Sequence, residues 1–278
     1  MKAGLKTLTS LSLSRLKLNM LGGITCSASG NLLTGWQFGT LTGEQELSLW
    51  ERCVATDDRL VLINDIIDTY CKFEAQGGSA KDLCIADRDY ILSLLACHFG
   101  QGLYWAVSTC PHCDERSDIQ IDLSKLPFKP AGETYPFAEI VVDGTSMKLK
   151  VPSLADQKME IKNIKNIDDA IHRLAGLCAE ELPKTLSPEL IEKINDAVQS
   201  VSPEVARSLQ VECNSCGETT TADLQILPRI IKAINNPLDD VHEIAAFYHW
   251  SEQEILKLTA TRRQSYIRRI LADQGRAY

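Results

Sequence analysis

Apolar side chains recur every three or four positions between residues 44 and 102. This spacing places them on one face of a helix, which is the pattern of a helix that packs against a core. It predicts three helices, over residues 44–54, 60–70 and 85–99. Gly100 and Gly102 end the third helix, since glycine readily adopts the conformation found at helix C-termini. We therefore expect an N-terminal helical region at residues 44–102.

The pattern changes to alternating apolar and polar residues over residues 103–152 and again over residues 204–227. Alternation is typical of β-strands, whose successive side chains point to opposite faces. The predicted strands cover residues 103–108, 116–123, 139–142, 147–151, 208–212 and 219–226. Asp143-Gly144 predicts a tight turn within one hairpin. Two other predicted hairpins each carry a Cys-x-x-Cys motif.

Helical spacing returns over residues 153–203 and over residues 228–278. In the first of these regions the predicted helices cover residues 167–178 and 188–198. Pro188 suits the first turn of the second helix, and Ser251 to Glu254 forms a capping box near the C-terminus. The fold class that follows is α+β, mainly helical, with a small antiparallel zinc-ribbon-like β module built from two distant hairpins.

Residues 1–43 show neither period. Leucine, serine and threonine are frequent there, and glycines interrupt the segment repeatedly. We expect an irregular N-terminal arm with little core of its own, and we hypothesise that residues 1–40 become ordered only on assembly. Lys2 and Lys6 precede several leucines, but polar residues interrupt these, so no signal-peptide core is evident.

Composition narrows the functional classes. Of the 278 residues, 44% are hydrophobic and 24% are charged, close to an ordinary globular protein with its own core. The formal net charge of −8 argues against a protein that coats DNA or RNA, because such proteins neutralise phosphates with lysine and arginine. No apolar run approaches the roughly 20 residues that a membrane-spanning helix needs. We therefore expect protein partners, no membrane contact, and nucleic acid only as an unfavoured partner.

Four of the ten cysteines form two Cys-x-x-Cys pairs, Cys110 with Cys113 and Cys213 with Cys216. Two such turns facing each other supply four thiolates in a tetrahedron, the usual structural zinc site. About 100 residues separate the pairs, against roughly 15–20 in compact zinc patterns, but the entropy cost of loop closure grows only slowly with length. We predict one structural zinc site with these four cysteines as ligands, and no other cofactor.

Other uses of the two pairs stay open at the level of sequence. A redox Cys-x-x-Cys motif would begin a helix, whereas strands follow both pairs here. Two disulfides would need an oxidising compartment, while the other six cysteines are scattered as expected for buried thiols in a reducing cytosol. An iron–sulfur cluster would also take four thiolates, although neither pair has a third cysteine beside it.

No catalytic constellation stands out. Four cysteines close the zinc coordination sphere, whereas a catalytic zinc keeps one position open. His242-Glu243 begins like a His-Glu-x-x-His motif, but position 246 is Ala246. The sequence also has no phosphate-binding loop, dinucleotide motif or nucleophile elbow. We expect His112 to face solvent, His98 to lie in the core, and the protein not to be an enzyme.

Several short motifs follow one another from residue 41 to the C-terminal region. They are Leu41-Thr42-Gly43-Glu44-Gln45-Glu46, Ala86-Asp87-Arg88-Asp89, Phe99-Gly100, Cys110-Pro111-His112-Cys113, Cys213-Asn214-Ser215-Cys216, Ile244-Ala245-Ala246-Phe247-Tyr248-His249-Trp250-Ser251 and Arg262-Arg263-Gln264-Ser265-Tyr266. Together they resemble the T4-type bacteriophage baseplate protein family, whose members are also described as baseplate hub assembly chaperones. The resemblance does not cover the N-terminal arm.

The resemblance implies a non-enzymatic component or assembly factor of the baseplate of a contractile phage tail. Its partners would be other baseplate or tail proteins, contacted through residues 1–43 and the C-terminal helices. Its place would be the virion, at the tail baseplate, or the host cytoplasm during assembly. The alternative is a zinc-ribbon nucleic-acid-binding module of a replication or transcription factor. The acidic balance and the single Arg116 beside the first cysteine pair count against that alternative.

Overall fold

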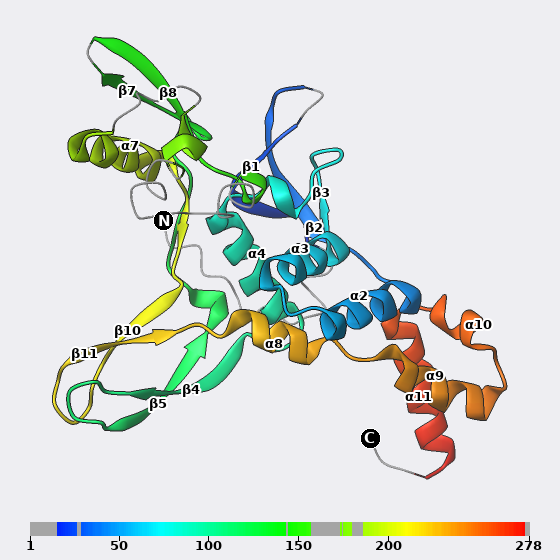
Figure 1. Cartoon of the computed structure of the whole chain (residues 1–278). Coiled ribbons are helices and arrows are strands. Elements are labelled where there is room, and N and C mark those ends of the chain that lie inside the picture. The colour runs from blue at the N-terminus through cyan, green and yellow to red at the C-terminus, as the bar shows by residue number, and fades with distance from the viewer. Residues whose placement is uncertain are drawn as a thin grey trace.

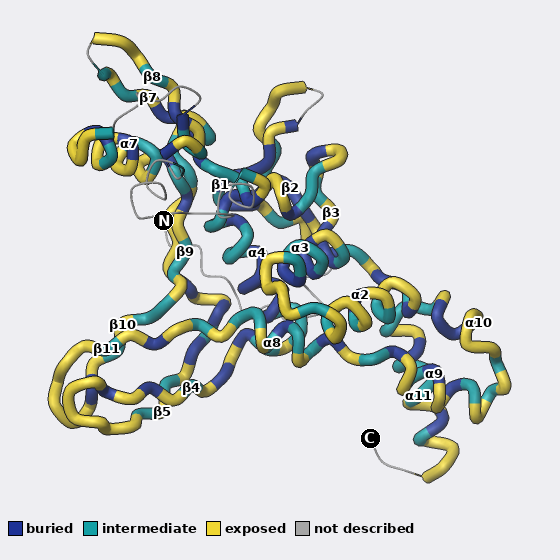
Figure 2. The backbone as a smooth tube through the Cα atoms, in the orientation of Figure 1, coloured by how far each residue is buried: buried dark blue, intermediate teal, exposed yellow. Residues whose placement is uncertain are grey.

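The computed structural model describes residues 16–26, 29–142, 144–156, 173, 175–179 and 186–275. These residues form helices and several small antiparallel sheets, which confirms the α+β class. Figure 1 shows α3 (Arg59–Tyr70) and α4 (Ile85–His98) near the centre, with hairpins projecting on one side and the last helices on the other. Buried residues concentrate around this centre, whereas the hairpin tips are exposed (Figure 2).

The N-terminal segment is not an irregular arm over its described part. Strands β1 (Leu18–Thr25), β2 (Leu32–Phe38) and β3 (Cys71–Phe73) form an antiparallel sheet in the order β1-β2-β3. Trp36 on β2 is only 1% exposed and belongs to the main core. The prediction for residues 1–43 is wrong here because β2 pairs with β3 across a long stretch of sequence, which local periodicity does not reveal. Residues 1–15 lie outside the described part of the chain.

A buried carboxylate fastens β1 to α4. The pairing of β1 with β2 shifts register in the middle of β1. In this interval the N–H groups of Leu21, Gly22 and Gly23 donate to the carboxylate of Asp87, at 2.7, 2.9 and 2.9 Å. Burial raises the pKa of Asp87 above its ordinary value, and the three N–H donors offset part of this rise. Gly22 is required at this contact, because a Cβ atom there would lie 2.7 Å from the Tyr135 ring.

The three predicted N-terminal helices are confirmed as α2 (Gly43–Ala55), α3 and α4. Thr42 starts α2 with a capping box, in which its hydroxyl accepts from the Gln45 N–H and the Gln45 side chain accepts from the Thr42 N–H. Asp58 caps α3, as expected for a carboxylate at a helix start. The short helical turn η1 (Ala80–Asp82) precedes α4. A second one, η2 (Leu123–Lys125), follows β5.

The two cysteine-bearing hairpins are present as predicted. β4 (Leu103–Thr109) pairs with β5 (Arg116–Asp122), and β10 (Ser208–Glu212) pairs with β11 (Thr219–Asp223), each as a separate two-stranded antiparallel sheet. The hairpins lie side by side, with β11 against β4 (Figure 1). β11 ends earlier than predicted, because α8 (Ile226–Ala233) begins at Ile226 and buries Ile230 in the main core.

A second core lies around β7 (Phe137–Val142), β8 (Thr145–Lys150) and α7 (Pro188–Val201). β7 and β8 form the predicted hairpin, and Pro188 occupies the first turn of α7. The sequence predicts a boundary between residues 152 and 153, but β7 and β8 before it pack against α7 after it. β6 (Phe128–Lys129) and β9 (Glu204–Val205) pair where the chain enters and leaves this part. The predicted helix at residues 167–178 lies mostly outside the described residues.

The C-terminal helices α9 (Pro237–Tyr248), α10 (Glu252–Leu256) and α11 (Ala260–Asp273) form a third core. One buried cation joins them to α2. Arg263 is 2% exposed, donates to the Leu258 carbonyl at 2.8 Å and to Asp240 at 2.9 Å, and forms an ion pair with Glu46. None of the described helices is long and apolar enough to cross a membrane.

We predict that Arg263→Ala lowers the free energy of unfolding by about 3–5 kcal/mol, because Glu46 and Asp240 would remain largely buried without a counter-charge. Arg262→Ala is the matched control, since Arg262 is exposed on the same helix and its loss should change stability by under about 0.5 kcal/mol. Urea unfolding followed by circular dichroism measures both variants. Equal effects of the two substitutions would contradict the role assigned to Arg263.

Candidate metal centre

The structure brings the four predicted cysteines together at the tips of the two hairpins. The Sγ atoms of Cys110, Cys113, Cys213 and Cys216 all lie within 4.8 Å of one another. The Sγ atoms of Cys110 and Cys216 lie 3.6 Å apart, and those of Cys113 and Cys213 lie 3.7 Å apart. A tetrahedron of sulfurs about 2.3 Å from a zinc ion has edges of about 3.8 Å, so these separations suit a zinc ion.

Both turns are built by the same backbone hydrogen bonds. In the first, the Cys110 N–H donates to the Glu115 carbonyl at 2.9 Å, and the Asp114 N–H donates to the Cys110 carbonyl at 3.0 Å. In the second, Cys213 donates to the Glu218 carbonyl at 2.9 Å and accepts from the residue four positions later, also at 2.9 Å. The equivalence of the two turns explains how distant segments present their sulfurs in matching geometry.

Each turn closes on a residue with a left-handed backbone. Gly217 has φ 75°, as the glycine after the second pair suggests, and Asp114 has φ 57° at the equivalent place in the first turn. Aspartate adopts this conformation more readily than most residues other than glycine. Asp114 is a functional position that sequence reasoning missed, although it stands four residues after Cys110 just as Gly217 stands four residues after Cys213.

Backbone N–H groups in the turns point at sulfur atoms. Those of Cys216 and Ser215 donate to the Cys213 sulfur and lower the pKa of this thiol to about 7. The hydrogen bond from the Glu115 N–H lowers the pKa of Cys113. The side-chain hydrogen bond with Cys216 and burial outweigh this effect, so the pKa of Cys113 rises to about 12. Four neighbouring thiols therefore do not all ionise by themselves. A divalent cation among them would stabilise the four thiolates.

The hairpins are also joined at their bases. Tyr104 on β4 is buried, and the guanidinium of Arg229 on α8 lies 3.2 Å from the centroid of its ring. Because α8 directly follows the second hairpin, this contact ties the end of the second hairpin to the first. Ile121 on β5 is fully buried in the main core. The base contact thus joins the two hairpins at one end, and the four sulfur atoms lie together at the other end.

The surroundings of the cysteines offer little space for a substrate. The cavity beside Cys110 and Cys213 measures about 10 Å³, roughly the room for one water molecule. The His112 side chain is 59% exposed, as predicted, and its Nε2 atom lies 3.9 Å from a carboxylate oxygen of Glu218. Within the described residues, no other group of three or more potential metal ligands gathers closely.

Cysteines outside the cluster behave as ordinary buried thiols. Burial raises the pKa of Cys84 to about 12 and that of Cys97 to about 11, and it also raises the pKa of Cys71. These thiols stay protonated at neutral pH, so they are poor nucleophiles and poor metal ligands. The cysteines of the cluster differ from them because four sulfur atoms lie close enough together to share one metal ion, and because the pKa of one of them, Cys213, is lowered.

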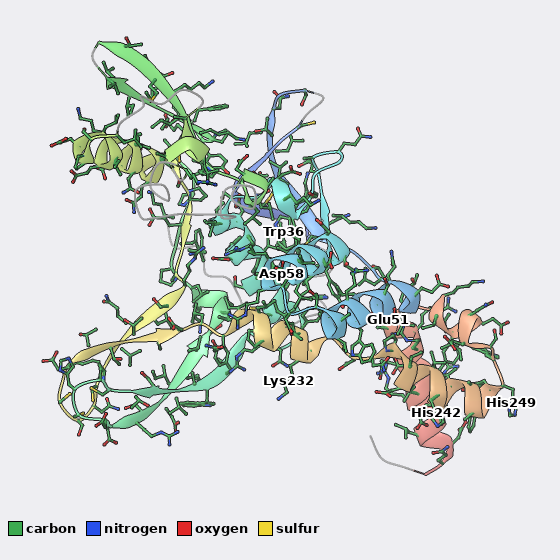
Figure 3. The ribbon with its side chains drawn as sticks, viewed as in Figure 1. Trp36, Glu51, Asp58, Lys232, His242 and His249 are labelled. Carbon is green, nitrogen blue, oxygen red and sulfur yellow. The ribbon has the colours of Figure 1, made fainter. Side chains whose placement is uncertain are left out.

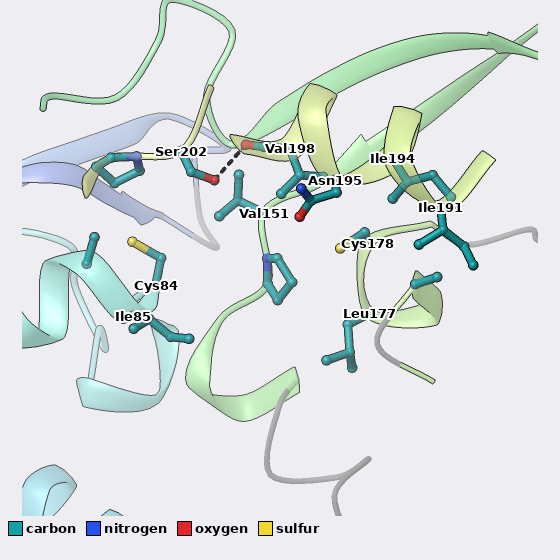
Figure 4. A pocket seen from close by; sticks show the side chains of 14 residues that line it. Cys84, Ile85, Val151, Leu177, Cys178, Ile191, Ile194, Asn195, Val198 and Ser202 are labelled. Carbon is teal, nitrogen blue, oxygen red and sulfur yellow. Dashed lines mark hydrogen bonds between the residues drawn. The ribbon is translucent and has the colours of Figure 1, made fainter. Parts of the chain in front are cut away.

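Two other places were candidates for a functional site: the histidines of α9 and an apolar pocket. His242 lies on α9 and His249 ends that helix, far from the cysteine hairpins (Figure 3). An apolar pocket of about 530 Å³ lies between the start of α4 and α7 (Figure 4). The described residues that line it include no Asp, Glu, Lys, Arg or His, and the Ser202 hydroxyl in it donates to the Val198 carbonyl at 2.7 Å. Neither site pairs an acid with a base.

We predict that Gly217→Val weakens zinc binding and lowers stability by roughly 1–2 kcal/mol, because a β-branched residue resists the left-handed conformation. Crowding is not the cause, since the nearest atom to an added Cβ lies 3.9 Å away. Gly217→Asn is the matched control and should cost less, because asparagine tolerates this conformation. Competition with a chromophoric chelator and thermal unfolding measure the two effects. Equal losses from valine and asparagine would contradict the conformational explanation.

Comparison with known proteins identifies the family. The model of the family described as T4 bacteriophage base plate protein matches residues 36–232, which is most of the chain and includes both cysteine pairs. The comparisons with curated proteins and with solved structures each found no match. The matched range begins within β2 and ends within α8, so it also covers the helical centre. The chain therefore belongs to the T4 bacteriophage base plate protein family.

Proposed function

We propose that this protein is a non-enzymatic component or assembly factor of a contractile phage tail baseplate, and that its four clustered cysteines hold a structural zinc ion. The family match carries the first part, because it spans the helical centre and both hairpins. The sulfur cluster carries the second, because its geometry suits tetrahedral zinc. Other baseplate or tail proteins are the partners in this proposal, and the virion or the host cytoplasm during assembly is the location.

The proposed zinc acts as a clamp on two hairpins that are distant in sequence. Each hairpin is only two-stranded, and an isolated two-stranded hairpin is marginally stable in water. Zinc bound by four thiolates contributes directly to folding free energy, since the unfolded chain has no preformed site. The clamp therefore fixes the orientation of exposed strand surfaces that a partner can contact.

A structural role is favoured over catalysis by the coordination itself. Four thiolates leave zinc no open position for water or substrate, and the cavity beside the cysteines is the size of one water molecule. Glu218, a carboxylate of the second turn, lies 3.9 Å from the exposed His112 rather than beside an open metal position. This arrangement provides no nucleophile that the metal activates.

Nucleic-acid binding is not supported by the surface around the cysteines. The two turns and their flanks carry Asp114, Glu115, Glu212 and Glu218, against Arg116. A phosphate backbone would be repelled by such a surface rather than attracted to it. Protein contacts are therefore the better account of the exposed hairpin tips.

We predict about one zinc ion per chain in protein purified without added metal, measured by plasma mass spectrometry. Cys113→Ser should lose the zinc and unfold at lower temperature, because three thiolates bind the metal less tightly than four. Cys53→Ser is the matched control and should keep the zinc, since Cys53 lies on α2 outside the cluster. Zinc retained in full by Cys113→Ser would contradict the assignment of the ligands.

The assembly role is tested in the phage that encodes the protein. Deletion of its gene should yield tails without complete baseplates in electron micrographs of infected cells. Supplying the intact protein or Cys53→Ser from a plasmid should restore them, while Cys113→Ser should not. Normal baseplates and infectious particles after deletion would contradict the proposed function. Mass spectrometry of purified particles then separates a resident component from a transient assembly factor.

A further inference from the structure

The four clustered cysteines differ in their access to solvent. Cys113 and Cys216 are exposed, whereas Cys110 and Cys213 are only 2% and 4% exposed. Each turn therefore has one sulfur that a dissolved reagent reaches and one that is buried. The two exposed sulfurs belong to different hairpins, and these hairpins lie side by side (Figure 1). A reagent that attacks thiols thus meets one accessible cysteine on each hairpin.

Two close sulfur contacts join one hairpin to the other. The exposed Cys216 lies 3.6 Å from the buried Cys110, measured between their Sγ atoms. In the same way, the exposed Cys113 lies 3.7 Å from the buried Cys213. The sulfurs of a disulfide lie about 2.0 Å apart, so each contact must shorten by under about 2 Å for a bond to form. Each exposed sulfur therefore has a buried sulfur of the opposite hairpin beside it.

The competing arrangement is a disulfide inside each Cys-x-x-Cys motif. In an unfolded chain this arrangement has the advantage, because a short loop closes at a lower entropy cost than the loop of about 100 residues between the two motifs. In the folded chain all four sulfur atoms already lie within 4.8 Å of one another, so loop length no longer decides the pairing. The positions of the sulfurs then favour the two contacts between hairpins.

We infer that the cluster is also a site of thiol oxidation, at which a low-molecular-weight disulfide such as oxidised glutathione links the two hairpins covalently. One product joins Cys110 to Cys216, and the other joins Cys113 to Cys213. An exposed thiolate attacks the small disulfide, whose S–S bond breaks, and one small thiol leaves. The buried cysteine beside it then attacks the protein sulfur of this mixed disulfide and displaces the second small thiol. Two cysteines thus lose two electrons, and their protons pass to the two small thiols.

Oxidation of this kind exchanges one clamp for another. Zinc bound by four thiolates and disulfides between the hairpins both join the same two tips, whereas disulfides inside each turn would displace the metal and leave the tips unlinked. In the proposed function, a chain that stays in the particle passes from a reducing host cytoplasm into oxidising surroundings. This role rests on the proposed function, but the pairing itself depends only on the positions of the four sulfurs.

The test maps the disulfides of the purified full chain after treatment with oxidised glutathione. Remaining thiols are blocked with iodoacetamide, and trypsin then cuts after Arg88, Arg116, Arg207 and Arg229. The first cysteine pair lies in the peptide of residues 89–116 and the second in the peptide of residues 208–229, so disulfides between the hairpins link these two peptides. Fragmentation of the linked peptides in a mass spectrometer assigns the bonded cysteines. The matched control is the same oxidation in concentrated urea.

The linked peptides should be the main product without urea. In urea the disulfides inside each turn should prevail, by on the order of 100-fold from loop length alone. Disulfides mainly inside the turns without urea would overturn the inference, and so would the absence of any disulfide at the cluster. The metal content of the same sample, measured before oxidation, tests the zinc separately. A chain without metal that still forms the linked peptides would contradict the proposed zinc site and support the pairing.

Discussion

Four sulfur atoms meet at the tips of two hairpins that are far apart in the sequence, and this is the constraint on which the proposed role of the hairpins depends. Each hairpin has only two strands, so neither gains much stability from its own sheet. The contact of Arg229 with Tyr104 joins their bases, and the four sulfur atoms lie together at their tips. In the proposed function, a metal ion bound by the four cysteines would hold the two hairpin tips together.

Two buried polar contacts also join elements that are distant in sequence. The Asp87 carboxylate joins α4 to the glycine-rich middle of β1, and the Arg263 guanidinium joins the C-terminal helices to α2. Both contacts are long-range in sequence. Asp87 lies beside Cys84 of the second core, and Arg263 connects the third core to α2, which contributes Leu49 to the main core. Buried charged groups of this kind are costly unless fully paired, so each one favours a single arrangement of the elements it connects.

Local signals in the sequence predict most of the elements and the four sulfur ligands, but they do not predict how distant parts pair. The helix at α2 and the hairpin turn near Gly144 follow from capping and turn residues that act over a few positions. The strands β1 and β2 pair with each other, but their glycine-interrupted sequence shows no regular strand period, and their further contacts with β3 and Asp87 lie far along the chain. Asp114 was missed because aspartate in a left-handed turn has no distinctive pattern, whereas Gly217 does.

The atoms that surround any metal retained by the purified protein test the proposed zinc site most directly. X-ray absorption at the zinc edge, measured on the purified full chain, reports the atoms around the metal and their distances. Coordination by Cys110, Cys113, Cys213 and Cys216 predicts four sulfur neighbours at about 2.3 Å and no nitrogen or oxygen. A shell that contains nitrogen or oxygen, or a protein that retains no metal at all, would contradict a closed four-thiolate clamp.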